Sequence, residues 1–138
     1  MKKTFLGISL LVVILIASCQ KEETNPATTT ADRDKFLATW RVQETSQRYG
    51  ATAYEMIISK DTSNTSDIII QNINQLGSKF WVRALVSGSY FNISPQVVSG
   101  NIISGSGYLQ SPTIVSLKYT KDEGGGIVDS LSCVLTKK

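Results

Sequence analysis

Histidine is absent from the 138 residues of the chain, and the only cysteines are Cys19 and Cys133. Without imidazole, serine and cysteine nucleophiles lack the base on which they ordinarily depend, and the commonest metal ligand is missing. Two cysteines, one of them in the amino-terminal segment, are too few for a disulfide framework. We therefore expect no catalysis, no metal site and no cofactor.

A large excess of one charge is also missing. The formal net charge is +3, and it falls to +1 when Lys2 and Lys3 are removed with the amino-terminal segment described below. Nucleic-acid-binding domains carry a pronounced basic patch, so we expect no nucleic-acid partner. The composition, 41% hydrophobic and 18% charged residues, is that of a globular protein with a real core.

The longest apolar run extends from Leu6 to Ala17 and follows two lysines. It is shorter than the roughly 20 residues that a membrane-spanning helix requires, and its layout is that of a secretory signal. Its end, Ile16–Cys19 (IASC), resembles the lipobox of bacterial lipoproteins. The resemblance implies that residues 1–18 are a signal peptide and that Cys19 carries lipid, which makes the membrane a partner of the chain.

A charged cluster, Gln20-Lys21-Glu22-Glu23, follows the expected anchor and is similar to the export signal of Bacteroidota surface lipoproteins. The alternative is that these charges only solvate a linker. The next stretch, Thr24–Ala31, is polar and contains Pro26, which favours a flexible tether. We expect residues 19–31 to be the lipidated amino terminus and linker of an outer-membrane protein that faces the cell surface.

The remaining residues, 32–138, suffice for one domain. Near its start, Trp40 and Val42 alternate with polar residues, which predicts a half-buried strand. The preceding Phe36-x-Ala38-x-Trp40 resembles the F-x-G-x-W opening of the lipocalin and calycin superfamily, with alanine in place of glycine. This resemblance implies a small barrel whose closed end is plugged by tryptophan.

Seven further segments read as short strands separated by turn residues. A strand edge or a bend is expected at Pro95, and the glycines near Gly105 predict either sharp coiling of the sheet or close approach of backbones. These strands are expected over 53–59, 67–73, 79–86, 89–93, 102–109, 113–120 and 127–136. Eight short strands without an intervening amphipathic helix predict an all-β, antiparallel up-and-down barrel, lipocalin-like in shape. A two-sheet sandwich is the alternative.

Cys133 shares strand parity with Leu131 and Leu135. Because side chains on one face of a strand recur every second residue, it is expected to be a small buried core residue rather than a nucleophile.

The candidate ligand site combines Trp81 and Arg83, two residues apart on one side of a predicted strand. An indole beside a guanidinium can stack on a sugar or an aromatic ligand and fix its polar groups. Glu44 has the inward parity of Trp40 and is the candidate second polar contact. The alternative is structural: Trp81 packs against a neighbouring strand, and Arg83 covers it.

These observations favour a lipid-anchored binding module for a small apolar molecule or a glycan. The alternative is a protein-interaction or enzyme-inhibitor lipoprotein that acts through exposed loops such as Lys60–Ser66. The interior of the barrel decides where a ligand would bind. An empty chamber favours the inside, and a filled core favours the outer surface.

Overall fold

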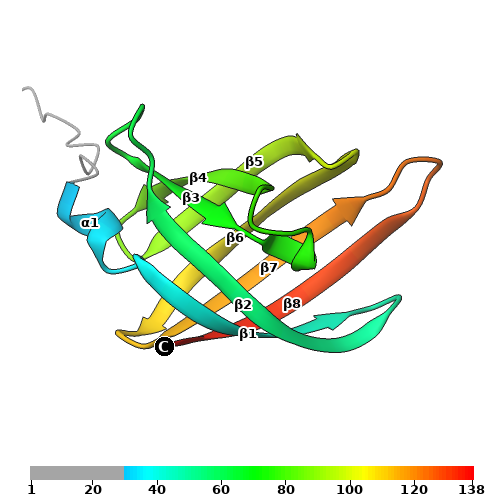
Figure 1. Ribbon diagram of the computed structural model, residues 1–138, viewed down its shortest axis with the longest axis horizontal. Helices are drawn as coiled ribbons and strands as arrows, with labels where there is room; N and C mark the ends of the chain where they lie inside the picture. Colours follow the sequence, from blue (N-terminus) through cyan, green and yellow to red (C-terminus); the bar gives the residue numbers. More distant parts are fainter. Residues whose placement is uncertain (1–29) are drawn as a thin grey trace, which may run out of the picture.

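The computed structural model describes residues 30–138, so Cys19, the expected signal peptide and most of the expected tether lie outside the described residues. Eight antiparallel strands follow one another as neighbours, and the last pairs with the first (Figure 1). This pairing closes the sheet. The predicted up-and-down barrel is therefore confirmed, and the two-sheet sandwich is wrong.

The elements, in chain order, are α1 (Thr30–Asp34), β1 (Ala38–Ser46), β2 (Gly50–Lys60), β3 (Asp67–Gln71), η1 (Ile73–Gln75), β4 (Trp81–Ser87), β5 (Tyr90–Val98), β6 (Asn101–Ser111), β7 (Ile114–Asp122) and β8 (Val128–Lys137). The strand expected over 67–73 ends earlier than predicted. It stops at Gln71 because Asn72 adopts a left-handed φ of 63°, and Ile73 then begins a short 3₁₀ turn.

The first end of the barrel is closed by aromatic side chains beside α1, at the left of Figure 1. Trp40 is fully buried, and its Nε1 donates to the Phe36 carbonyl oxygen at 2.8 Å. The ring of Phe36 meets that of Phe91 edge to face, with centroids 5.4 Å apart. Lys137 Nζ lies 5.6 Å from the Trp40 ring centroid and covers it from β8. Trp40 thus plugs this end, as the resemblance implied.

Arg33 fastens α1 to the loop between β2 and β3. Its Nη1 donates to the backbone oxygens of Asp61, Asn64 and Asp67 at 3.1, 2.9 and 3.0 Å. Arg33 is 4% exposed, so these carbonyls take the place of water around a buried cation. The loop is therefore held against the same end of the barrel as Trp40.

Two local features of the wall follow the sequence predictions. Gly105 and Gly107 face inward on β6: a Cβ added at Gly105 would overlap the Lys118 carbonyl oxygen of β7, and a Cβ added at Gly107 would overlap the Phe91 ring. Glycine is required there because the aromatic ring occupies that space. On β5, the pairing with β6 shifts register between Ile93 and Gln96, so Pro95 lies in a bulge, where its missing N–H costs no ladder bond.

The inward-facing side chains form one continuous apolar core along the barrel axis. Its largest fully buried members are Trp40, Phe36, Phe91, Met56, Ile68, Ile70, Ile73, Ile93, Ile103, Leu117, Leu131 and Leu135. In residues 30–138, no helix is long and apolar enough to cross a membrane.

Candidate functional site

The structure places Trp81 and Arg83 on the outer face of β4. Trp81 is 45% exposed, and the guanidinium carbon of Arg83 lies 5.9 Å from the indole centroid. Arg83 Nε pairs with a carboxylate oxygen of Asp61 at 2.5 Å and lies 3.8 Å from one of Asp67. The arginine is thus held in a fixed place beside the indole, while almost half of its side chain remains in solvent.

The two aspartates beside Arg83 differ in their electrostatics. The backbone N–H of Ser63, followed by the guanidinium of Arg83, holds the pKa of Asp61 below its ordinary value. Loss of water around Asp67 raises the pKa of that carboxyl, and Arg83 opposes the shift only in part. Asp61 is therefore the firmer partner of Arg83, in agreement with the two distances.

The wall is split beside this pair. Strand β4 pairs with β5 only from Leu85 to Ser87, although β4 begins at Trp81. Beyond the bulge at Pro95, the Gln96 side chain spans the gap: its Oε1 accepts from the Arg83 N–H at 2.9 Å, and its Nε2 donates to the Arg83 carbonyl at 2.6 Å. One carboxamide thereby supplies bonds that the sheet ladder lacks at this point.

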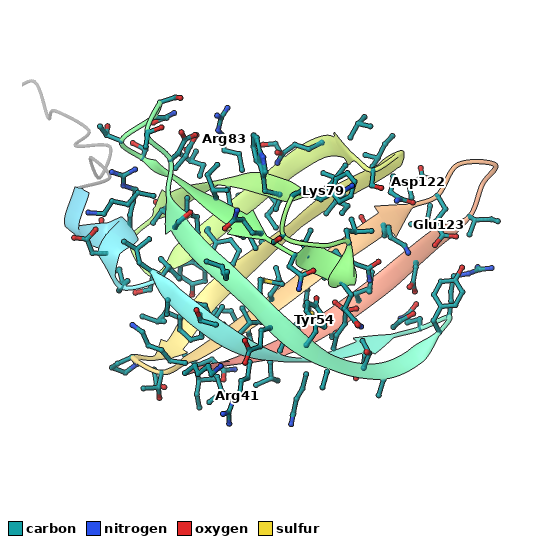
Figure 2. The ribbon with its side chains drawn as sticks, viewed as in Figure 1. Arg41, Tyr54, Lys79, Arg83, Asp122 and Glu123 are labelled. Carbon is teal, nitrogen blue, oxygen red and sulfur yellow. The ribbon has the colours of Figure 1, made fainter. Side chains whose placement is uncertain are left out.

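Two outer concavities flank Gln96. The larger has a volume of about 510 Å³ and is lined by Lys79, Phe80, Trp81, Gln96, Val97, Val98 and Ser99. The smaller has a volume of about 270 Å³ and is lined by Asp67, Arg83, Leu85, Asn92, Ser94 and Gln96. Apolar surface, a planar amide and two cations thus meet on one face of the molecule. Figure 2 shows Lys79 and Arg83 along the same upper side.

Glu44 does not join this site. It is 2% exposed and points into the barrel, whereas Trp81 and Arg83 point away from it. The prediction of an inward Glu44 near one end of the interior agrees with its position. The single site that combined it with Trp81 and Arg83 does not form, because the barrel wall separates the two faces.

Glu44 instead lies at the centre of a buried hydrogen-bond cluster at the end of the barrel opposite α1. Its Oε2 accepts from Tyr54 Oη at 2.6 Å, from Tyr119 Oη at 2.5 Å and from Cys133 Sγ at 3.4 Å. Its Oε1 accepts from Asn74 Nδ2 at 3.0 Å. The carboxylate is therefore surrounded by donors from four parts of the chain.

Burial controls the protonation of these donors. Loss of water, followed by the proximity of Glu44, raises the pKa of Cys133 far above its ordinary value. The pKa of Tyr54 is raised in the same order of causes. The pKa of Tyr119 is raised by burial first and then by Tyr54 and Glu44. A thiol held protonated is a poor nucleophile, so the environment of Cys133 suits a hydrogen-bond donor in the core.

The sequence pattern gave Trp81, Arg83 and Glu44 as candidates but not the residues that contact them in the structure. Tyr119 and Cys133 have inward parity, which predicts that they are buried. It does not predict that both donate to Glu44, because Glu44 lies on a different strand. Asn74 sits in a turn that reads as the end of a strand. For Gln96, the neighbouring Pro95 signals a bulge and gives no hint of the bond to Arg83.

Comparison with known proteins supports the fold and goes no further. No protein-family model matches the chain, and no curated protein matches it either. Among solved structures, EF1p2_mFAP2b bound to DFHBI is similar with a TM-score of 0.58 and 16% identity, over 80% of this chain and 99% of that one. A redesigned β-barrel is similar with a TM-score of 0.56 and 15% identity, over 78% and 95%.

A third similar structure is a protein of unknown function from the DUF3598 family of Nostoc punctiforme. Its TM-score is 0.50 with 13% identity, over 76% of this chain and 48% of that one. At these low identities, the three structural similarities show a shared fold and nothing about function. The chain has a closed eight-stranded antiparallel barrel fold, similar to that of these solved structures.

Proposed function

We propose that the chain is a lipid-anchored binding protein that holds a glycan or a small apolar molecule on its outer face, beside Trp81 and Arg83. The observation that carries this proposal is the contrast between a filled interior and a solvent-open concavity of about 510 Å³ at Trp81. That volume lies within the range of about 300–1,000 Å³ in which small ligands bind. The proposal includes no catalytic step.

Each group in the concavity has a role in binding. The exposed face of the Trp81 indole offers the platform on which a sugar or aromatic ring stacks. Arg83, fixed by Asp61, orients polar groups at one side of that platform, and Lys79, whose Nζ lies 5.2 Å from the Phe80 ring centroid, contributes a cation at the other. Val97, 76% exposed, extends the apolar surface. The bidentate contact of Gln96 keeps the two strands at a constant separation.

Tryptophan fluorescence tests this assignment, because the chain has two tryptophans and only Trp81 is exposed. In the Trp40→Phe variant, Trp81 is the sole reporter. We expect at least one member of a panel of cellotriose, chitotriose, hyaluronan tetrasaccharide and decanoate to change its emission in a saturable way. In the matched Trp81→Phe variant, emission from Trp40 should not respond. Absence of a response in both variants contradicts the proposal.

The proposed anchor is a lipid on Cys19, in the outer membrane with the barrel outside the cell. The support is the signal-like segment that ends in Ile16–Cys19. Several acyl chains on one residue make attachment effectively permanent, since each buried methylene contributes about 0.8 kcal/mol. The Cys19→Ala variant should not incorporate labelled palmitate, whereas Cys133→Ala should. Lipid on Cys19→Ala overturns the assignment.

A further inference from the structure

The carboxyl group of Asp67 lies on the outer face of the barrel without a hydrogen-bond partner in residues 30–138. Its side chain is 9% exposed, and its buried Oδ1 makes no hydrogen bond. Its Oδ2 is 3.8 Å from Arg83 Nε, which exceeds hydrogen-bond distance, because Arg83 pairs more closely with Asp61. A buried polar group without a partner is unfavourable, so this carboxyl is suited to bind a group from outside the chain.

Asp67 lines the smaller of the two outer concavities, together with Leu85 and Asn92. Strand register places these three residues in one row across β3, β4 and β5, with Leu85 in the middle. Paired residues on neighbouring strands are about 5 Å apart, so Asp67 and Asn92 are separated by about 10 Å. Leu85 is 52% exposed, and Asn92 is also exposed. The row therefore presents an apolar surface with a polar group on each side.

Strand β4 connects this row to the indole of Trp81. Trp81, Arg83 and Leu85 all face outward, and a strand advances about 3.3 Å per residue, so Trp81 and Leu85 are about 13 Å apart. The guanidinium of Arg83 lies between them, and the two concavities meet at Gln96. A ligand that extends along this line is longer than a single ring.

A sugar ring has the chemistry that the row requires. Its C–H face packs on Leu85, and the hydroxyls at its rim reach Asp67 and Asn92. A hydroxyl group suits either protonation state of Asp67, because it donates to a carboxylate and accepts from a carboxyl. An alkyl chain on the same row would cover both polar side chains without giving them partners, which costs affinity.

We propose that the ligand of the outer face is an oligosaccharide, and that Asp67, Leu85 and Asn92 form the subsite for a second ring beyond the one that stacks on Trp81. Arg83 lies between the two rings and donates to their hydroxyls. This inference rests on the proposed function, because the first ring lies on the same indole. It excludes the small apolar molecule as the ligand.

The experiment titrates the full-length Trp40→Phe chain with cellotriose, chitotriose, hyaluronan tetrasaccharide and decanoate, and follows Trp81 emission. At least one of the three oligosaccharides should bind at least about tenfold more tightly than decanoate. That oligosaccharide is then titrated into variants of the row.

Asp67→Ala removes the carboxyl group, so affinity for the oligosaccharide should fall at least about tenfold. Asn92→Ala removes the polar group on the other side of Leu85, and affinity should fall about fivefold. Decanoate affinity should not fall in either variant, whereas general damage to the face would weaken both kinds of ligand. Ser106→Ala, which extends the same row on β6 outside the concavity, should bind as the unmodified face does.

Three results would overturn the subsite and leave the proposed function standing: decanoate that binds as tightly as every oligosaccharide, oligosaccharide binding that is unchanged in Asp67→Ala and Asn92→Ala, or an equal loss of decanoate binding in these variants. Absence of binding by the whole panel would overturn both. If Asp67→Ala does not fold, the exposed Asn92→Ala decides the outcome.

Discussion

The two tryptophans of the chain occupy opposite faces of the same wall, and their surroundings differ completely. Trp40 points inward, is fully buried and donates to Phe36. Trp81 points outward, is 45% exposed and has only Arg83 near its ring among the ring contacts of the described residues. The difference shows that strand parity places one indole in the core and leaves the other on the surface, where the proposed site uses it.

The tyrosines repeat the contrast. Tyr119 is buried against Glu44, whereas the exposed Tyr108 accepts from Gln110 Nε2 at 2.9 Å and lies 5.9 Å from the Tyr90 ring. Burial raises the pKa of Tyr119, and the hydrogen bond from Gln110 lowers that of Tyr108. The two faces therefore differ in electrostatics as well as in packing.

Trp40→Ala is expected to have the largest effect on stability. Removal of a fully buried indole leaves a cavity at the closed end, so the free energy of unfolding should fall by about 3–5 kcal/mol. The matched Trp81→Ala variant should change it by no more than about 0.5 kcal/mol. Urea denaturation followed by circular dichroism measures both. Equal losses in the two variants would contradict the inward and outward assignment.

Gly107→Ala tests the inner face where it is tightest. A new Cβ would overlap the Phe91 ring, and overpacking of this kind costs about 1–3 kcal/mol. Its neighbour Ser106 faces outward, so Ser106→Ala should be within about 0.5 kcal/mol of the unmodified chain. A neutral Gly107→Ala would mean that β6 and β5 can separate without loss.

Alkaline pH should weaken the inner cluster. Because the pKa values of Tyr54, Tyr119 and Cys133 are raised in the folded state, the unfolded chain loses these protons first as pH rises. The stability that these groups contribute is complete at pH values below their pKa values in the unfolded chain. It declines as the pH rises above those values, about 8.5 for cysteine and about 10 for tyrosine. Urea midpoints should fall across this range, and less steeply in a Tyr54→Phe/Tyr119→Phe variant. If the urea midpoints of both proteins fell equally steeply with pH, ionisation of Tyr54 and Tyr119 would not be the cause of the lost stability.

Gln96→Ala should have the smallest effect, on the outer face. It removes two hydrogen bonds to the Arg83 backbone at a partly solvated gap, which corresponds to about 1 kcal/mol. Hydrogen exchange of the Arg83 amide should accelerate, while Ser94→Ala, on the same strand, should leave it unchanged. An unaltered exchange rate in Gln96→Ala would show that the carboxamide does not hold the gap.

Much of the fold could be predicted because parity and turn chemistry are local. Alternation placed Trp40 and Cys133 inside, and Pro95 predicted a break in the strand, which the structure shows as a bulge. The Glu44 cluster could not be predicted from local patterns. It depends on the pairing of β1 with β8 and on the turn that brings Asn74 to Glu44. The end of β3 at Gln71 could not be predicted either. The isoleucines at 68–70 favour a strand that continues, and the strand ends because Asn72 adopts a left-handed backbone conformation that its residue type does not announce.

Only the residues of the candidate site that lie on one strand could be predicted together. Trp81 and Arg83 are adjacent on one face of a single strand, so their pairing follows from the sequence. Gln96 reaches Arg83 across a break in strand pairing, and alternation along one strand carries no information about such a break.

Calorimetric titration of a double variant tests the proposed function most directly. With the panel member that binds, Trp81→Ala/Arg83→Ala should lose all measurable heat of binding while its circular dichroism stays unchanged. The matched Lys118→Ala/Ser132→Ala variant, which alters a separate outer concavity of about 460 Å³, should bind as the unmodified chain does. Normal binding by a folded Trp81→Ala/Arg83→Ala variant would contradict a ligand site on this face.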